Sequence, residues 1–258
     1  MKICVFDTET VNLEKPFCYD IGYIIYDTDT AEHLVSRSFV VEQVWHNMPL
    51  FTTAYYADKR EGYVKRMRGR RTIMAKFGNI TQQMVRDFET YSVEGAYAYN
   101  SSFDEKVFAF NCDWFKCVNP FDNIPIFDIR GYVHKKIAFT ENYQKWCDIN
   151  KRFTESGHYS TTAESVFQYL VHDENFVEAH TGLEDAEIEL AILVHCIEEL
   201  SAKWNENYKV YSSIPRRIER TLTIIDTDGV SWEFPYERIT IKKDTEKTEI
   251  ILKKVLTK

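Results

Sequence analysis

The chain of 258 residues lacks long apolar stretches, and no run of about 18 apolar residues occurs in it. We therefore expect no transmembrane helix and no membrane contact. The opening segment, MKICVFDTET, reaches two carboxylates too early to form the apolar core of a secretory signal peptide. These two absences predict a cytoplasmic protein.

Zinc-binding cysteine pairs are also missing, because no C-x-x-C spacing occurs in the sequence. In a reducing compartment we expect every cysteine to be a free thiol. Internal repeats and low-complexity stretches are absent too. The composition is ordinary for a globular protein, and the length is sufficient to bury a hydrophobic core without disulfides or structural metals. The six cysteines are Cys4, Cys18, Cys112, Cys117, Cys147 and Cys196.

The sequence has no overall excess of positive charge. Its formal net charge is −8, which taken alone disfavours a nucleic-acid partner. The charge is uneven, because residues 205–258 hold 11 basic and 9 acidic residues and the part before them carries a net charge of −10. A basic segment, residues 59–71, holds seven Lys or Arg against one Glu. A carboxylate-rich metal site in the N-terminal part would help explain the acidic excess.

The hydrophobic pattern predicts an α/β fold for residues 1–204. Residues 2–6 include apolar side chains at both even- and odd-numbered positions, as in a strand that is buried on both faces. A run of strands followed by alternating helices and strands is typical of a mixed sheet flanked by helices. Further strands are expected at residues 20–27, 34–41, 95–100 and 124–131.

Helices are expected where capping residues precede an apolar period of 3.6 residues. Thr81 is the predicted N-cap of a helix that ends near Tyr91, and the segment 102–105, SFDE, is a capping box that opens a second helix. A long helix follows Gly182. Residues 42–80 have no clean period, and we expect a helical insertion with loops there.

The texture of the chain changes after residue 204. In residues 205–258 apolar and polar residues alternate, and turn residues occur at Asp228-Gly229 and near 244–247. This pattern predicts a small antiparallel β unit. We therefore divide the chain into two domains, 1–204 and 205–258. The second could serve docking, dimerisation or substrate binding, and nothing in the sequence chooses among these roles.

The first candidate for chemistry is the segment Asp7-Thr8-Glu9, which directly follows the first apolar strand. Residues i and i+2 of an extended chain point to one face. Two carboxylates on that face form a hard-oxygen site suited to Mg²⁺ or Mn²⁺. The D-x-E pattern alone is weak, because it occurs three more times and a solvated acidic face would explain each occurrence.

Two further acids, Asp104 and Asp185, fall in the first turn of predicted helices, where acids are common because of the helix dipole. His180 precedes Asp185 by five residues, and Gly182 lets the chain turn between them. The functional interpretation places both acids and the histidine beside the first two carboxylates. The ordinary interpretation is a pair of helix-start acids and an exposed loop histidine.

Taken together, FDTET, YNSSFD and HTGLED resemble the three motifs of the DEDDh exonuclease superfamily. The resemblance covers roughly residues 1–204 and implies a ribonuclease-H-like mixed β-sheet flanked by helices. The H-x4-D spacing is that of the histidine branch. Segments such as TAYYADK are similar to exonucleases of bacteriophages and their hosts, and a phage-encoded protein would lie in the host cytoplasm. The resemblance implies four metal-binding acids and a histidine base, which are Asp7, Glu9, Asp104, Asp185 and His180.

The reaction implied by this resemblance is 3′→5′ removal of nucleoside 5′-monophosphates. Two divalent ions, Mg²⁺ or Mn²⁺, about 4 Å apart would clamp the scissile phosphate. They would offset the four negative charges of the carboxylates. His180 would take the proton from the attacking water, which suits a side chain that titrates near neutrality.

The basic segment 59–71 is the best candidate for a surface that follows a nucleic-acid backbone, because Tyr63 is interleaved in it and Tyr55 and Tyr56 precede it. A solvated basic helix explains it equally well. Phe103 could stack on a terminal base, although a core aromatic is the commoner role at a helix start. The expected nucleic-acid contacts are Thr8, Phe103, Arg66, Arg68, Arg70 and Arg71.

The main hypothesis is therefore an exonuclease acting on single-stranded DNA. A 3′-trimming exoribonuclease is an alternative with the same site, because discrimination depends on which group contacts the 2′ position. A polymerase-associated proofreading module is another, with a polymerase or replication protein as partner. A non-catalytic nucleic-acid-binding domain is disfavoured, since all five catalytic side chains are present.

Overall fold

The structure is a computed structural model that describes residues 1–216, 218–225, 231–240 and 250–254. The chain folds into two compact units, Met1–Ile137 with Thr161–Val210, and Ala138–Ser160 with Tyr211–Lys258. The second unit thus includes a segment from the middle of the chain that the sequence did not single out. The division by role at residues 204 and 205 stays a prediction.

A six-stranded mixed sheet organises the first unit, in the order β4-β3-β2-β1-β5-β6. β1 pairs antiparallel with β2 and β2 with β3, whereas β5 and β6 extend the sheet in parallel. Apart from the short β4, these directions are those of a ribonuclease-H-like sheet, which confirms the predicted fold class. The strands are β1 (Lys2–Thr10), β2 (Cys18–Asp27), β3 (Glu32–Val41), β4 (Ile73–Ala75), β5 (Gly95–Ala98) and β6 (Ile126–Asp128).

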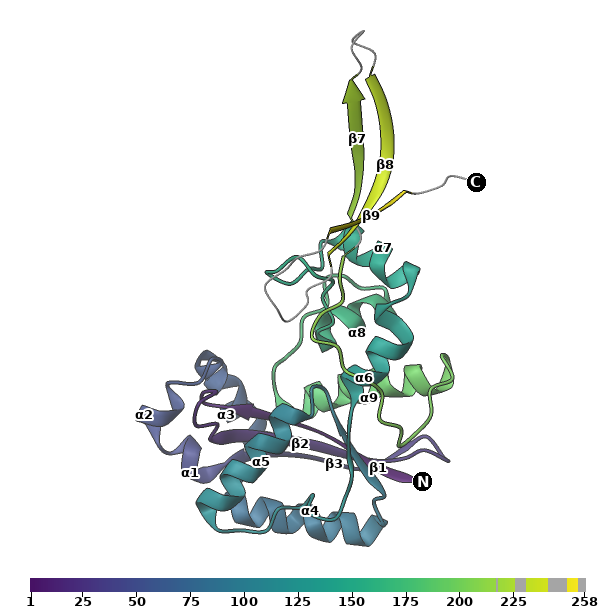
Figure 1. The fold of residues 1–258 in the computed structure, drawn as a ribbon. Helices are drawn as coiled ribbons and strands as arrows, with labels where there is room; N and C mark the ends of the chain where they lie inside the picture. Colours follow the sequence, from purple (N-terminus) through teal and green to yellow (C-terminus); the bar gives the residue numbers. More distant parts are fainter. Residues whose placement is uncertain (217, 226–230, 241–249, 255–258) are drawn as a thin grey trace. The chain divides into compact units, whose positions relative to one another are not determined.

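Helices cover both faces of this sheet (Figure 1). α4 (Phe77–Tyr91) and α5 (Ser102–Phe115) lie on one face, and α9 (Gly182–Glu198) packs on β1 and β2 from the other. The remaining helical segments outside the second unit are α1 (Glu42–Trp45), α2 (Met48–Phe51), η1 (Ala57–Lys59), α3 (Arg60–Arg68), α6 (Ile129–Val133) and α8 (Ala163–Val171), and η2 (His134–Ala138) ends at the unit boundary.

The central strand β1 is buried on both faces, as its sequence predicts, because residues 3–6 are 0% exposed. Successive side chains alternate between the two faces. Phe6 belongs to the core on the side of α4 and α5, where its ring packs edge-on against Phe108 at 5.8 Å. Asp7 and Glu9 have the opposite parity, and they therefore face α9.

Two helices begin at residues other than the predicted ones. α4 begins at Phe77 rather than after Thr81, and the Phe77 backbone N–H donates to Gln43 Oε1 at 3.1 Å. A side chain from a distant segment thus satisfies a free backbone group of the first turn. α5 begins at Ser102 with Ser101 as its N-cap, so Ser102 is the first residue of the helix instead of its cap.

Residues 42–80 form the predicted helical insertion, with one addition. Ile73–Ala75 pairs in parallel with β3 as the edge strand β4. The strand expected at 124–131 is shorter, because the Asp128 side chain accepts a hydrogen bond from the Arg130 backbone N–H at 2.8 Å and starts α6.

The second unit holds α7 (Glu141–Asn150) and an antiparallel sheet in the order β7-β8-β9. This sheet confirms the predicted C-terminal β unit. Both predicted turns, Asp228-Gly229 and 244–247, lie outside the described residues. The strands are β7 (Ile218–Ile225), β8 (Ser231–Thr240) and β9 (Ile250–Lys254).

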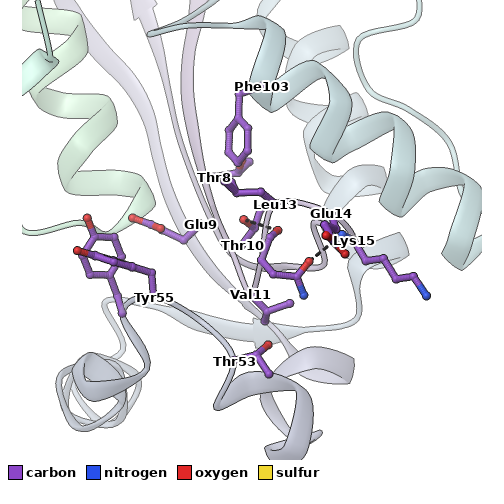
Figure 2. Close-up of a pocket in the computed structure, with 12 residues that line it drawn as sticks. Thr8, Glu9, Thr10, Val11, Leu13, Glu14, Lys15, Thr53, Tyr55 and Phe103 are labelled. Atoms are coloured by element: carbon purple, nitrogen blue, oxygen red, sulfur yellow. Dashed lines mark hydrogen bonds between the residues drawn. The ribbon is translucent and has the colours of Figure 1, made fainter. Parts of the chain in front are cut away.

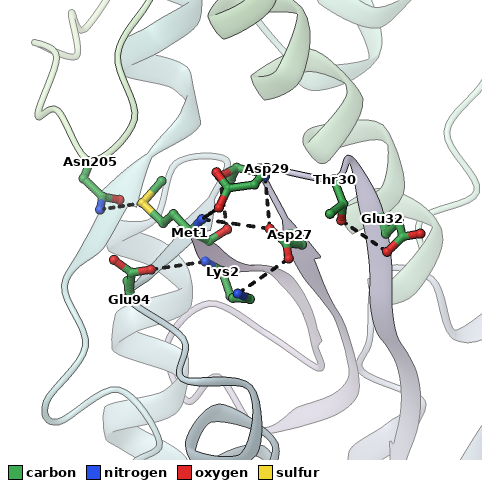
Figure 3. A network of polar contacts seen from close by, with 9 residues as sticks. Met1, Lys2, Asp27, Asp29, Thr30, Glu32, Glu94 and Asn205 are labelled. Carbon is green, nitrogen blue, oxygen red and sulfur yellow. Dashed lines mark hydrogen bonds and ion pairs between the residues drawn. The ribbon is translucent and has the colours of Figure 1, made fainter.

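Polar contacts tie down the start of β1 (Figure 3). The Met1 amino group pairs with Asp29 at 2.6 Å, and Lys2 Nζ lies 3.6 Å from Asp27 Oδ2. The Asn205 amide, from the segment after α9, contacts the Met1 sulfur at 3.3 Å. The network anchors the strand whose other end carries the acidic segment.

All six cysteines are free thiols, as predicted, and five of them are buried. Within the described ranges, the helices are all too short or too polar to cross a membrane.

Candidate active site

The start of α9 touches the sheet backbone directly. A Cβ on Gly182 would stand 2.5 Å from the backbone N of Gly22 and 2.9 Å from the carbonyl oxygen of Asp7. A side chain at Gly182 would therefore collide with backbone, which cannot swing away. This close approach brings Asp185, in the first turn of α9, beside the acidic end of β1.

Glu9, His180 and Asp185 converge, and one potential ligand atom from each lies within 4.8 Å of the others. Asp7 belongs to the same cluster. Burial raises the pKa of Asp7 well above its ordinary value, and neighbouring carboxylates add to the shift, Glu189 most strongly. The acids are thus close enough to repel one another.

Asp104 reaches the cluster from the first turn of α5 and is 2% exposed. The Thr8 hydroxyl donates to Asp104 Oδ1 at 2.6 Å, which ties α5 to β1 between the two acids of the first motif. Burial raises the pKa of Asp104 to about 7, although this hydrogen bond acts in the lowering direction. We expected Thr8 to contact nucleic acid, but in the structure its hydroxyl binds the Asp104 carboxylate. All five predicted catalytic residues are therefore gathered at one end of the sheet.

The acidic cluster fits a divalent metal ion. Burial raises the pKa of Glu9 to about 9 and that of Asp185 to about 7, and neighbouring carboxylates reinforce both shifts. In the part of the chain that the structure describes, Asp185 Oδ1 is buried without a hydrogen-bond partner. A hard cation that binds oxygen ligands would reduce the repulsion between these carboxylates and would give Asp185 Oδ1 a partner. Asp7, Glu9, Asp104 and Asp185 could hold such an ion.

His180 lies on the loop before α9 with a φ of +50°, in the left-handed region. A side chain makes this conformation cost about 1–3 kcal/mol. Its imidazole stacks on the Tyr56 ring at 4.3 Å and 12°, and its Nδ1 lies 3.9 Å from Glu178 Oε2. Burial lowers the pKa of His180, with the Lys59 charge acting in the same direction. A lowered pKa favours the neutral ring, which is the form in which a general base acts.

A buried carboxylate that sequence reasoning missed is Asp20 on β2, opposite Glu9 in the strand register. It accepts hydrogen bonds from the Tyr63 hydroxyl at 2.6 Å and the Gly182 backbone N–H at 2.9 Å. Burial raises the pKa of Asp20 to about 6. The side chain joins β2, α3 and the start of α9, and its position at a strand start gave no signal of this role.

Glu189 is a second missed acid, one turn beyond Asp185 on α9 and 4% exposed. It accepts a hydrogen bond from the Tyr99 backbone N–H at 3.1 Å, at the end of β5. Burial and then the Asp104 charge raise its pKa well above the ordinary value. The i, i+4 spacing from Asp185 could have signalled it, since such residues share one helix face.

A cavity of about 870 Å³ opens at the acidic end of β1 (Figure 2). Glu9 and Thr8 form one wall, and Phe103 and Tyr55 border it from two other elements. Tyr55 is 87% exposed, so its ring is open to a ligand. The volume is that of a small-molecule site, and the aromatic borders suit a stacked base.

The arginines expected to contact nucleic acid in the basic segment 59–71 have two kinds of surroundings. Arg66 donates to Thr181 Oγ1 at 2.8 Å and pairs with Glu184, so it turns towards the loop that carries His180. The remaining arginines that we expected at nucleic acid are exposed, and they are Arg68, Arg70 and Arg71.

Comparisons with known proteins give no family model that matches the chain and no match among curated proteins. Solved structures with a similar fold do exist. The chain matches E. coli exonuclease I in complex with a dA16 oligonucleotide over 78% of its own length and 41% of that chain, with 13% identity and a TM-score of 0.43. It thus spans less than half of that enzyme.

The nuclease domain of 3′hExo, a DEDDh family member bound to rAMP, matches over 80% of this chain and 96% of that one, with 12% identity and a TM-score of 0.49. A 3′-exonuclease that recognises a histone mRNA stem-loop matches over 83% and 74%, with 10% identity and a TM-score of 0.48. At such identities the similarity concerns the fold alone, and the reaction has to be inferred from the residues of this chain.

Proposed function

We propose that this chain is a metal-dependent 3′→5′ exonuclease that hydrolyses phosphodiesters at the 3′ end of single-stranded DNA and releases nucleoside 5′-monophosphates. The observation that carries the proposal is the convergence of Glu9, Asp185 and His180, with Asp7 and Asp104 beside them. Glu9 of this cluster also lines an open cavity. The polarity and the product rest on the resemblance of the three motifs to DEDDh exonucleases.

Asp7, Glu9, Asp104 and Asp185 would hold two divalent ions, Mg²⁺ or Mn²⁺, because two such ions offset four carboxylate charges. When bound, such ions supply Lewis-acid activation of the phosphodiester and charge stabilisation at the leaving 3′ oxygen. The chain's own part is to fix the carboxylates. Thr8 restrains Asp104 through its hydroxyl, and the contact of Gly182 with β2 sets the position of Asp185.

His180 is proposed as the general base that takes the proton of the attacking water. A histidine base must be neutral before it acts, and the lowered pKa of His180 favours the neutral form. Its Nδ1 lies 3.9 Å from Glu178 Oε2, but burial raises the pKa of Glu178 to about 8. The charge of Glu164 acts to raise the pKa of His180 and so favours the protonated ring after transfer.

The substrate end is proposed to lie in the cavity bordered by Tyr55 and Phe103, whose rings would stack on bases. Stacking is tolerant of sequence, which suits an exonuclease that removes one nucleotide after another. The exposed arginines 68, 70 and 71 offer positive charge to backbone phosphates. DNA is proposed over RNA as the substrate, and digestion of matched oligonucleotides distinguishes the two.

The test is a time course on single-stranded DNA labelled at the 3′ or at the 5′ end, with Mg²⁺, with Mn²⁺ and with a chelator. The proposal expects immediate release of the 3′ label and a shrinking ladder from the 5′-labelled strand, both abolished by the chelator. Digestion of a matched RNA but not of DNA would replace DNA by RNA as substrate. No digestion of either would overturn the enzyme assignment in favour of a binding domain.

A further inference from the structure

The loop that carries His180 has a conformation that needs support. The backbone of His180 lies in the left-handed region, with a φ of +50°, although the residue carries a side chain. Residues with side chains hold such a conformation only where the surrounding structure fixes it. The contacts of residues 179–181 show where that support comes from.

Each residue of this loop is held by a side chain from one segment, residues 56–66. The Tyr56 ring stacks nearly parallel on the His180 imidazole, with ring centroids 4.3 Å apart. Lys59 Nζ donates to the Ala179 carbonyl oxygen at 2.6 Å. Arg66 donates to Thr181 Oγ1 at 2.8 Å.

These contacts are connected to one another. Lys59 Nζ lies 4.4 Å from the centroid of the Tyr56 ring, so the ammonium group supports the ring that supports the imidazole. Arg66 also pairs with Glu184, whose carboxylate accepts from Thr181 Oγ1 at 3.1 Å. The loop is thereby joined to the first turn of α9, one residue before Asp185.

Lys59 and Arg66 point towards the His180 loop, unlike the exposed arginines of the basic segment 59–71. Lys59 and Arg66 are partly buried against the loop, whereas the arginines 68, 70 and 71 are exposed. A phosphate-binding role would require free guanidinium and ammonium groups. Lys59 and Arg66 instead direct their hydrogen bonds to the backbone and side chains of the His180 loop.

We propose that Tyr56, Lys59 and Arg66 are positioning residues, which clamp the loop 179–181 so that the His180 ring faces the carboxylates of Glu9 and Asp185. This inference rests on the proposed exonuclease function and assigns part of the insertion a role in it. None of the three residues takes part in proton transfer. They act through His180, whose placement they determine.

The test compares Tyr56→Leu, which removes the stacking ring, with Tyr56→Phe, which keeps it. Since a misplaced catalytic group costs up to about 100-fold in rate, Tyr56→Leu should lower kcat by roughly 10- to 100-fold. Tyr56 also lines the cavity proposed for the substrate end, so the KM for a single-stranded oligonucleotide is compared in Lys59→Met, where it should stay unchanged. Tyr56→Phe should restore turnover, and Glu61→Gln, exposed on α3 in the same segment, is the matched control.

A second readout does not depend on activity. In the chelated protein, the proton resonances of the His180 ring, assigned by their loss in His180→Ala, should carry an upfield ring-current shift. The shift should persist in Tyr56→Phe and vanish in Tyr56→Leu. Lys59→Met provides an independent variant that removes the hydrogen bond to Ala179 and keeps an apolar stem, and it should lower kcat in the same manner.

The outcomes separate the two levels of inference. Support for the clamp is a lower kcat in Tyr56→Leu that Tyr56→Phe rescues, with loss of the ring-current shift in Tyr56→Leu, together with a lower kcat at constant KM in Lys59→Met. Parental turnover in both Tyr56→Leu and Lys59→Met, or a raised KM at constant kcat, overturns it while the exonuclease function stands. A parental protein that digests no nucleic acid overturns the function and the clamp together.

Discussion

Gly22 of β2 and Gly182 of α9 lie with their backbones in contact, because a Cβ built on Gly22 would stand 1.9 Å from the Leu183 backbone N. The Gly182 backbone N–H also donates to the Asp20 carboxyl group at 2.9 Å. This contact fixes the start of α9 on the sheet. The position of Asp185 relative to Glu9 follows from it.

Gly182→Ala should therefore destabilise the protein. The added methyl group would meet the backbone of β1 and β2, and overpacking of this kind costs about 1–3 kcal/mol. Urea unfolding gives the free energy of unfolding. Gly62→Ala is the control, since nothing lies within 4 Å of a Cβ there and alanine in an exposed helix should stabilise by roughly 0.5–1 kcal/mol. Equal stability of the two variants would contradict the close packing.

Asp7→Ala and Asp185→Ala should each abolish metal binding and nuclease activity. Both variants remove an oxygen ligand and one of the negative charges that attract a divalent cation. Isothermal titration with Mn²⁺ measures binding, and the labelled oligonucleotide assay measures activity. Asp113→Ala, an exposed acid on α5 that pairs with Lys116, should leave both unchanged. Undiminished Mn²⁺ affinity in either site variant would refute the proposed ligand set.

His180→Ala should keep Mn²⁺ and oligonucleotide binding and lose most turnover, by about 100- to 10,000-fold if the side chain is the general base. The reason is that the variant removes a proton acceptor and leaves the four carboxylates in place. Single-turnover rates and equilibrium binding separate the two effects. His46→Ala, at an exposed helix end, serves as control. A near-parental rate would show that another group takes the proton.

Without metal, the acidic cluster should destabilise the fold as the pH rises. Burial raises the pKa of Asp104 and Asp185 to about 7, against about 4 in an unfolded chain. The folded state then holds more protons, so the contribution of these groups to stability is complete below pH 4 and is lost as the pH rises towards 7. Melting temperatures in chelator should fall over this range, and less steeply in Asp185→Asn.

Added Mg²⁺ or Mn²⁺ should reverse this loss, because a metal ion binds the ionised carboxylates of the folded chain. The rise in melting temperature on metal addition should be larger at pH 8 than at pH 5. A rise of the same size at both pH values would speak against carboxylate ligands with raised pKa.

Arg70→Gln combined with Arg71→Gln should weaken oligonucleotide binding in all sequences to a similar degree. Both side chains are exposed, and each phosphate-binding arginine removed should reduce the slope of the salt dependence of binding by about one unit, so the double variant should reduce it by about two. Fluorescence anisotropy at several salt concentrations measures this slope. An unchanged slope would leave these arginines as a solvated surface.

The sequence alone predicted the mixed sheet and most of its strands. The reason lies in β1, where residues 3–6 are apolar at both parities, a pattern typical of a strand buried on both faces. It also indicated the candidate catalytic residues, because Asp7 and Glu9 share a strand face by the two-residue period, and because the three motifs together resemble those of DEDDh exonucleases; their roles stay a prediction. Such relationships depend on local geometry.

The start of α4 and the edge strand β4 could not be predicted in the same way. Phe77 begins α4 because Gln43, more than 30 residues earlier in the sequence, accepts the hydrogen bond of its backbone N–H. β4 is held by its pairing with β3. Propensity within a window of neighbouring residues carries no information about a distant partner.

The sequence by itself determined which residues are candidates for the chemistry, since the three motifs contain Asp7, Glu9, Asp104, His180 and Asp185. Only the tertiary structure decided what surrounds them. It placed the buried carboxylates of Asp20 and Glu189 beside the site, and it turned Arg66 towards the His180 loop instead of the solvent. The physical reason is that burial, charge repulsion and hydrogen bonding depend on distances between segments far apart in the chain, and these distances exist only once the helices have packed on the sheet.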